Sequence, residues 1–167
     1  RFRASCSESD LTSANIIIIC VPTPLGPHQE PNIDYIYQSL ELIRNHLVPP
    51  SLVILESTTY PGTTDDILLP YLSEHFVLDR DFYLAFSPER EDPGNSSFSL
   101  RDIPKVVGAV SGISLEYASF LYKNIVNQVV PVSSARVAEL SKLLENVHRA
   151  VNIGPVSYTH LRAHETV

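Results

Sequence analysis

The chain has 167 residues, of which 44% are hydrophobic and 19% are charged, and its formal net charge is -7 at pH 7. This length and composition are typical of one globular domain with a buried core. The acidic balance argues against a nucleic-acid-binding surface, which needs clustered Lys and Arg, and the longest apolar run, residues 16–21, is too short to span a membrane.

Strand and helix patterns alternate along the chain. The first strand is predicted at residues 16–20, IIIIC, where no polar face is left, so we expect this strand to be covered on both sides. Apolar residues at helical spacing then predict a helix over 33–47. Further strands are predicted at 49–57, 82–88, 105–110 and 127–134, and further helices after the Thr63–Thr64 pair, at 113–126 and at 135–151. This alternation predicts an α/β fold with a mostly parallel sheet and helices on both faces.

Sheets of this class bind ligands beyond the carboxyl ends of their strands. Four segments follow predicted strands and are therefore candidates for a site: VPTPL (21–25), ESTTYPGTT (56–64), SPERED (87–92) and PVSS (131–134). The serine pair of the last segment can also cap the helix that follows it. Thr63 or Thr64 is expected to cap another helix, with Asp65 and Asp66 in its first turn.

Three of these segments have a chemical interpretation and a structural one. Thr23 lies between two prolines in a rigid loop and can offer its hydroxyl to a ribose or nicotinamide, or the loop is a plain turn. Residues 56–64 can present N–H groups and hydroxyls to a diphosphate or ribose, or they only cap a helix. Glu89 can activate a water and Arg90 can bind a phosphate or carboxylate, or both belong to a solvated loop.

The last predicted helix carries a second group of polar candidates. Lys142 and Asn146 are spaced i, i+4 and share a helix face with Glu139. In a cleft, Lys142 can stabilise a developing oxyanion, whereas an exposed surface pair is the alternative. The pair borders an apolar stripe that we expect to be buried, formed by Leu140, Leu143, Leu144, Val147 and Val151.

The C-terminal residues differ in character from the rest of the chain. His160 and His164 have the i, i+4 spacing of two metal ligands, but the pattern offers no third ligand and we expect no metal. The segment VSYTHLRAHET resembles the translation of a sequencing adapter. We therefore expect residues 155–167 to be a non-native tail.

Five segments together resemble the UDP-glucose/GDP-mannose dehydrogenase family, in its order and at its spacing. They are CVPTPL, ESTTYPGTT, FSPEREDPGN, IPKVVG and AELSKLLENVHRAVNI, and the resemblance extends over nearly all of the chain up to Gly154. The second and third are most similar to the UDP-N-acetylglucosamine 6-dehydrogenase branch. The resemblance implies a Rossmann-like fold, NAD as cofactor, and two-step oxidation of the C6 alcohol of UDP-N-acetylglucosamine to the uronate, for polysaccharide precursor synthesis.

The resemblance also implies roles for individual residues. It places Thr23, Glu89, Lys142 and Asn146 in the catalytic machinery. The positions that match cofactor contacts are Thr23, Ser57 and Thr58, and those that match substrate contacts are Glu89, Arg90, Lys142 and Asn146.

Two family features are missing from this sequence. It contains no G-x-G-x-x-G turn, and neither Cys6 nor Cys20 has the context of the family's nucleophilic cysteine. We therefore expect an internal piece: residues 1–134 as the C-terminal part of the NAD-binding domain and 135–154 as the start of the central dimerisation helix. Such a piece is expected to bind NAD⁺ poorly, to have no turnover alone and to expose an apolar sheet edge.

The resemblance implies a nucleotide-sugar substrate and a homodimer or larger homo-oligomer of the full-length enzyme. Cys6 and Cys20 form no disulfide or metal pattern, so we expect a cytoplasmic location. We expect no nucleic-acid or membrane partner. Two alternatives stay open. The sugar is that of a UDP-glucose, UDP-N-acetylmannosamine or GDP-mannose dehydrogenase, or the domain is a non-catalytic interaction module.

Overall fold

A computed structural model describes residues 2–24, 26, 31–89 and 101–163, with side-chain surroundings given up to His148 and for Val151. The sheet has the strand order β1-β2-β3-β4-β5. Its strands are β1 (Ile16–Ile19), β2 (Ser51–Leu55), β3 (Phe82–Phe86), β4 (Lys105–Ala109) and β5 (Val129–Pro131). Neighbouring strands are parallel except β3 and β4, which are antiparallel. The predicted α/β class with a mostly parallel sheet is thus confirmed.

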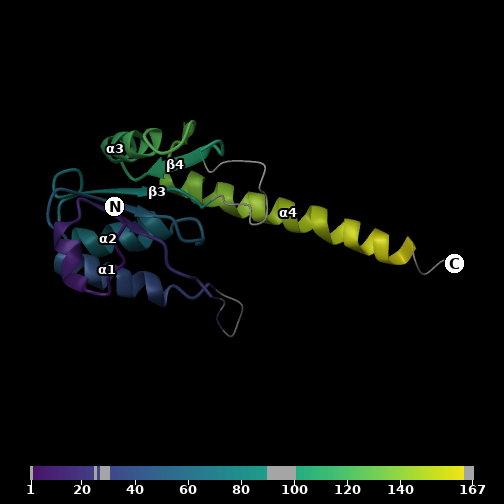
Figure 1. Ribbon diagram of the computed structural model, residues 1–167, viewed down its shortest axis with the longest axis horizontal. Coiled ribbons are helices and arrows are strands. Elements are labelled where there is room, and N and C mark those ends of the chain that lie inside the picture. The colour runs from purple at the N-terminus through teal and green to yellow at the C-terminus, as the bar shows by residue number, and fades with distance from the viewer. Residues whose placement is uncertain (1, 25, 27–30, 90–100, 164–167) are drawn as a thin grey trace.

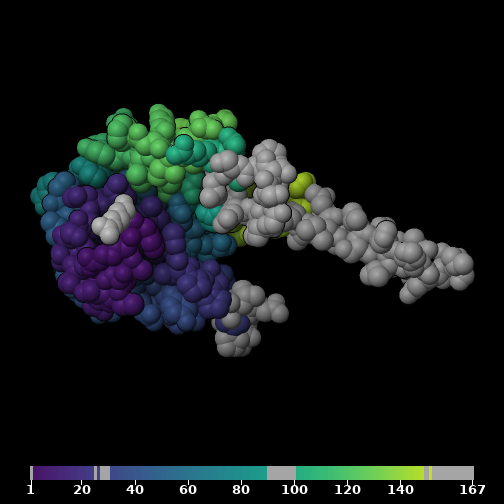
Figure 2. All heavy atoms as spheres, viewed as in Figure 1, coloured from purple at the N-terminus to yellow at the C-terminus, as the bar shows by residue number. Residues whose placement is uncertain are grey.

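Helices cover both faces of this sheet. They are η1 (Glu8–Ser13), α1 (Asp34–His46), η2 (Thr64–Leu68), α2 (Leu69–Ser73), α3 (Gly112–Lys123) and α4 (Ala135–Ala163). Figure 1 shows α1 and α2 on one side of the sheet and α3 on the other. In Figure 2 the atoms of α3 (green) form one side of the body and the N-terminal elements (purple to blue) form the opposite side.

The alternation of side chains along β2 explains why both faces need cover. Val53 and Leu55 belong to a core shared with α1 and α2, whereas Leu52 and Ile54 belong to a second core under α3. All five residues of the strand are buried. A central strand with apolar residues on both faces requires a layer of helices on each side.

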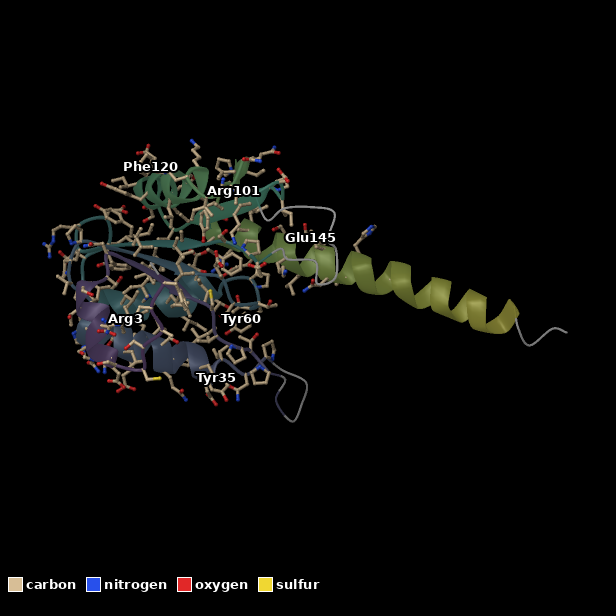
Figure 3. The ribbon with its side chains drawn as sticks, in the orientation of Figure 1. Arg3, Tyr35, Tyr60, Arg101, Phe120 and Glu145 are labelled. Carbon is tan, nitrogen blue, oxygen red and sulfur yellow. The ribbon has the colours of Figure 1, made fainter. Side chains whose placement is uncertain are left out.

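β1 differs from the expectation of a strand covered on both sides. Ile17 and Ile19 are buried, but Ile16 and Ile18 are 44% and 41% exposed. β1 is at the end of the sheet, and the uncovered face continues into a groove of about 400 Å³ beside α3. The rim of this groove includes Phe120, which points outward from α3 in Figure 3. The end strand of the sheet thus exposes apolar side chains on one face.

The direction of β5 also differs from the expectation. Because β4 is antiparallel to β3 and β5 is parallel to β4, β5 runs opposite to β1, β2 and β3. The segment 131–134 therefore does not follow a strand end at the edge where the three parallel strands end. Ser134 instead caps α4 as predicted, because its Oγ accepts a hydrogen bond from the Val137 N–H at 3.3 Å.

α4 is longer than the helix predicted for residues 135–151. Its backbone continues to Ala163, through most of the segment expected to be a non-native tail. Figure 1 shows that it begins beside β3 and β4 and then projects away from the sheet. Once a helix has formed, each added residue gains a backbone hydrogen bond, which favours continuation beyond the predicted end. His164 lies outside the described residues.

Candidate active site

The ends of the three parallel strands bring three of the predicted segments to one edge of the sheet. Ile19 is paired with Leu55, and Leu55 is paired with Phe86. The residues that follow these strands, at 20–23, 56–59 and 87–89, therefore leave the sheet at the same level. This is the edge at which parallel α/β sheets hold ligands.

The first two of these segments are joined by hydrogen bonds. The Thr23 hydroxyl donates to the Thr58 carbonyl oxygen at 2.7 Å. Ser57 is buried, and its Oγ accepts from the Val21 N–H at 2.8 Å and donates to the Ile19 carbonyl oxygen at 3.4 Å. Ser57 thus ties the first segment to the second, while Thr58 is exposed at the surface of the site.

The third segment is contacted by α4. Lys142 Nζ donates a hydrogen bond to the backbone carbonyl oxygen of Glu89. Lys142 is half-buried, whereas Glu89 and Asn146 are exposed. The structure therefore brings Lys142 and Glu89 together although 53 positions separate them in sequence. Arg90 lies outside the described residues.

The apolar stripe beside Lys142 is not buried as predicted. Leu140 is 46% exposed, Leu144 61% and Val147 58%. The expectation was wrong because α4 lies beside β3 and β4 at its start and then projects away from the sheet, which leaves these side chains at the surface.

A partly buried charge cluster that the sequence reasoning missed lies behind the three loops. Glu56 Oε1 is 2.8 Å from Lys105 Nζ, and both side chains are only 12–13% exposed. The Tyr122 hydroxyl donates a hydrogen bond to the same carboxylate oxygen, and Lys105 lies 5.1 Å from the centre of the Tyr122 ring. Glu56 lies near the carboxyl end of the strand predicted at 49–57, and a carboxylate at that position of a buried strand is the signal that could have identified it.

The Glu56 carboxylate affects two neighbouring acids. Burial and the nearby negative charge of Glu56 raise the pKa of the Tyr122 hydroxyl well above its ordinary value. Burial, and then the charge of Glu56, also raise the pKa of the Cys20 thiol, whose Sγ is 3.7 Å from Glu56 Oε2. A raised pKa leaves less thiolate at neutral pH, so Cys20 is a poor nucleophile.

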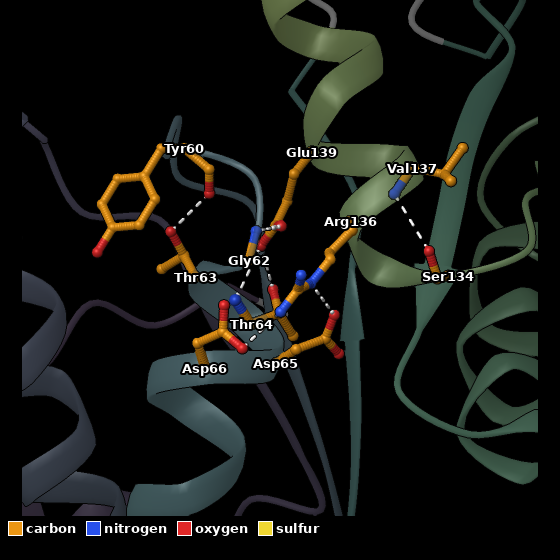
Figure 4. A network of polar contacts seen from close by, with 10 residues as sticks. All are labelled: Tyr60, Gly62, Thr63, Thr64, Asp65, Asp66, Ser134, Arg136, Val137 and Glu139. Atoms are coloured by element: carbon orange, nitrogen blue, oxygen red, sulfur yellow. Dashed lines mark hydrogen bonds and ion pairs between the residues drawn. The ribbon is translucent and has the colours of Figure 1, made fainter.

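A second missed residue, Glu139, satisfies the N-terminus of the helix after residue 62 (Figure 4). Its carboxylate accepts from the Gly62 N–H at 2.5 Å, from the Thr64 N–H at 2.9 Å and from the Thr64 hydroxyl at 2.7 Å. The prediction that Thr63 or Thr64 caps this helix was wrong, since the Thr63 hydroxyl donates to the Tyr60 carbonyl oxygen and Thr64 binds Glu139. The N–H groups of Gly62 and Thr64 are therefore bound by a carboxylate of the protein itself.

Two arginine–aspartate ion pairs lie beside this cap. Asp65 and Asp66 are in the first turn of η2 as predicted, and both are paired with Arg136 of α4, at 3.2 and 2.5 Å. Glu139 itself is fully buried. Its sequence signal is the i, i+4 spacing with Ala135, a small residue that is buried where α4 lies close to the sheet.

The loop after β2 has unused hydrogen-bonding capacity of the kind that a ribose or amide can satisfy. Thr59 is 4% exposed, and its hydroxyl has no hydrogen-bond partner among the described residues. Because a buried unpaired hydroxyl costs about 1–3 kcal/mol, it usually indicates a missing partner. Together with Thr23 and Thr58, it fits the sugar or nicotinamide end of a dinucleotide.

The family profile described as "UDP-glucose/GDP-mannose dehydrogenase family, NAD binding domain" matches residues 1–126. The chain belongs to this family. Its cofactor is accordingly NAD, and the resemblance drawn from the five sequence segments is confirmed.

Individual members of the family give the extent of the similarity. Protein CapL of Staphylococcus aureus is 37% identical over 150 residues, which is 88% of this chain and 35% of that protein. The UDP-N-acetyl-D-glucosamine 6-dehydrogenase of Pseudomonas aeruginosa is 34% identical over 89% of this chain and 36% of its own length. The structure of a UDP-D-ManNAc dehydrogenase from Pyrococcus horikoshii superposes with a TM-score of 0.85 at 33% identity, covering 96% of this chain and 38% of that one.

The chain thus spans little more than a third of the length of these family members. Within the described residues, no helix has both the length and the apolar character needed to cross a membrane.

Proposed function

We propose that this chain supplies part of the NAD-binding half of a nucleotide-sugar 6-dehydrogenase that oxidises the C6 alcohol of UDP-N-acetylglucosamine to the uronate. The contact of Lys142 with Glu89 carries the proposal, because it joins the helix with the oxyanion candidate to the loop with the acid/base candidate. Thr23 and Thr58 lie at the same sheet edge, where the cofactor of such a fold is held. Family membership supports the reaction class.

The residues divide the chemistry between them. NAD⁺ supplies a hydride acceptor in each of the two oxidation steps. We assign to the Glu89 carboxylate the transfer of protons to and from the reacting water, and to Lys142 the stabilisation of negative charge on the C6 oxygen. Asn146 lies one turn beyond Lys142 and is assigned to the substrate, as is Arg90. Thr23, Ser57 and Thr58 are assigned to the cofactor, Ser57 through its bonds to both loops.

The identity of the sugar is the finer part of the proposal. The relatives include both UDP-N-acetyl-D-glucosamine 6-dehydrogenases and UDP-N-acetyl-D-mannosamine dehydrogenases. UDP-N-acetylglucosamine is preferred because ESTTYPGTT and SPEREDPGN are most similar to that branch. UDP-N-acetylmannosamine is the second candidate, favoured by the structural similarity to the Pyrococcus horikoshii protein.

The proposed organisation follows from the same assignment. Residues 1–134 form the C-terminal part of the NAD-binding domain, residues 135–154 begin the central helix, and residues 155–167 are a non-native tail. A cytoplasmic location and a role in polysaccharide precursor synthesis belong to the proposal as well.

The test is a chimera in which residues 14–151 of this chain replace the matching part of the Pseudomonas aeruginosa enzyme. We expect the chimera to reduce NAD⁺ with UDP-N-acetylglucosamine, while the 167-residue chain alone produces no NADH. Because acid/base catalysis contributes about 10²- to 10⁴-fold, Glu89→Gln should lower kcat by at least about 100-fold. Glu41→Gln, at an exposed position of α1, is the matched control and should leave kcat unchanged.

Two results would contradict the proposal. One is a folded chimera that reduces NAD⁺ with none of the UDP sugars. The other is a Glu89→Gln chimera whose kcat equals that of the parent. A chimera that prefers UDP-N-acetylmannosamine would retain the reaction class and replace the sugar.

A further inference from the structure

We propose that Glu139 is a positioning residue for Lys142: its buried carboxylate anchors α4 to the loop after β2 and so holds the Lys142 ammonium against Glu89. The inference rests on the proposed role of Lys142, but the contacts that carry it are independent of any ligand. Glu139 reaches Gly62 and Thr64, which are 77 and 75 positions away in sequence.

The Glu139 carboxylate is fully committed to this anchor. One oxygen accepts from the Gly62 N–H, and the other accepts from both the N–H and the hydroxyl of Thr64. The residue is 0% exposed, so in the folded chain these donors depend on the carboxylate and not on solvent. A charged acceptor makes each bond stronger than a bond between neutral groups, and its removal leaves buried donors unsatisfied.

The geometry of α4 connects this anchor to Lys142. Residues three apart lie on one face of a helix, so Lys142 follows Glu139 on the side that faces the sheet edge. Ala135, one turn before Glu139, and Ala138, directly before it, are buried against the sheet core. Among the side chains of α4 that the structure describes, Glu139 is the last fully buried one, so the buried part of the helix ends one turn before Lys142. A change in the tilt or rotation of α4 at Glu139 is transmitted directly to Lys142.

Glu139 itself is not placed to react. Its oxygens are occupied by three donors of the protein, and burial raises its pKa above the ordinary value. Arg136, by contrast, is an exposed residue of the same helix whose ion pairs with Asp65 and Asp66 lie at the surface. Ion pairs at the surface contribute little to stability. Arg136 therefore offers a matched control, because it joins α4 to the same helix start as Glu139.

The experiment observes Lys142 directly in the 167-residue chain. The sequence contains three lysines, Lys105, Lys123 and Lys142, so reductive ¹³C-methylation gives three lysine signals besides that of the N-terminal amine. Single Lys→Arg variants assign them. Lys105 is in the buried pair with Glu56 and reports whether the sheet stays folded, while Lys123 is exposed.

We expect Glu139→Gln and Glu139→Ala to move the Lys142 signal to the position of an unstructured lysine while the Lys105 signal stays displaced from it. Arg136→Gln should leave all three signals in place. An unchanged Lys142 signal in both Glu139 variants overturns the proposal. Collapse of the Lys105 signal together with Lys142 in Glu139→Gln also overturns it, because it shows a general role in stability.

Activity separates this inference from the proposed function. In the active chimera, Glu139→Gln should lower kcat about tenfold or more with the KM for NAD⁺ unchanged, because only the helix that carries Lys142 is released. A change in KM for NAD⁺ with kcat unchanged contradicts the positioning role. If the Lys142 signal moves as expected but the chimera shows no turnover, the positioning stands and the proposed function falls.

Discussion

Glu56 is the acidic residue at the centre of the charge cluster behind the candidate site. Its carboxylate is shared by Lys105 and Tyr122 and lies near Cys20. A buried carboxylate with a cationic partner is tolerated because the pair is nearly neutral, whereas removal of either partner leaves an uncompensated charge. The three strand ends thus meet in front of a neutral, hydrogen-bonded cluster.

Cys20 should react slowly with alkylating reagents in the native chain. Its raised pKa reduces the thiolate fraction about tenfold for each pKa unit, so iodoacetamide should modify Cys20 more slowly than Cys6. Glu56→Gln removes the neighbouring negative charge and should increase the alkylation rate of Cys20 but not that of Cys6. Peptide mass spectrometry measures both rates. Glu8→Gln, at an exposed position in η1, is the control. If Cys20 is alkylated at the same rate in the parent and in Glu56→Gln, the charge of Glu56 does not control its reactivity.

Asp81 should make the fold acid-sensitive over a defined range. Hydrogen bonds from Arg80 and from the Val77 N–H lower the pKa of Asp81 from 3.8 to about 2. Because the folded pKa is below the unfolded value, the carboxylate stabilises the fold above 3.8, and this stability is lost as the pH falls through about 2. Urea unfolding of Asp81→Asn should therefore differ from the parent at neutral pH and converge with it near pH 2. A constant difference at all pH values would exclude this cause, and Glu74→Gln serves as the control.

At the scale of elements, the contact of α4 with the sheet depends on a glycine. A Cβ atom at Gly108 in β4 would lie 2.2 Å from the Ser134 carbonyl oxygen and 2.9 Å from Ala138 Cβ. The backbone just before α4 therefore approaches β4 more closely than any side chain allows. A Cβ atom added at Gly112, at the start of α3, would have no other atom within 4 Å.

Gly108→Ala should destabilise the chain, because the clash is with backbone and cannot be relieved by a side-chain rotation. We expect a loss of about 1–3 kcal/mol in the free energy of unfolding, measured with urea. Gly112→Ala adds a methyl group in open space and restricts the unfolded chain, so it should be neutral or stabilising by up to about 1 kcal/mol. Equal effects of the two substitutions would show that the close approach of α4 does not matter.

At the scale of the whole molecule, the apolar surface of α4 is the prominent feature. Its exposed apolar residues follow the 3,4 spacing of a coiled-coil seam: Val137, Leu140, Leu144, Val147 and Val151. They lie on the helix that projects from the body in Figure 1. A second copy of the same helix has the matching pattern, so we expect α4 to pair with its equivalent in a homodimer.

Leu144→Glu should convert this dimer to a monomer. A charge in the seam has to be desolvated for the helices to pair, and the apolar contact area is lost as well. Light scattering coupled to size exclusion gives the mass, and His148→Gln on the same helix is the control. A parent chain that is monomeric at all concentrations would refute the pairing of α4.

Local patterns in the sequence determined the elements and the loops that carry chemistry. Runs of β-branched residues, helical spacing and proline-bounded turns identified the strands, most of the helices, and the segments with Thr23, Ser57 and Glu89, because these features depend on neighbours along the chain. Only the tertiary structure decided the reversed direction of β5, the uncovered face of β1 and the exposed stripe of α4. It also decided that Glu139 binds residues 62 and 64 and that Lys142 meets Glu89. The contacts of Lys142 and Glu139 join residues 53 to 77 positions apart, and no local period records which strand or helix end becomes a neighbour.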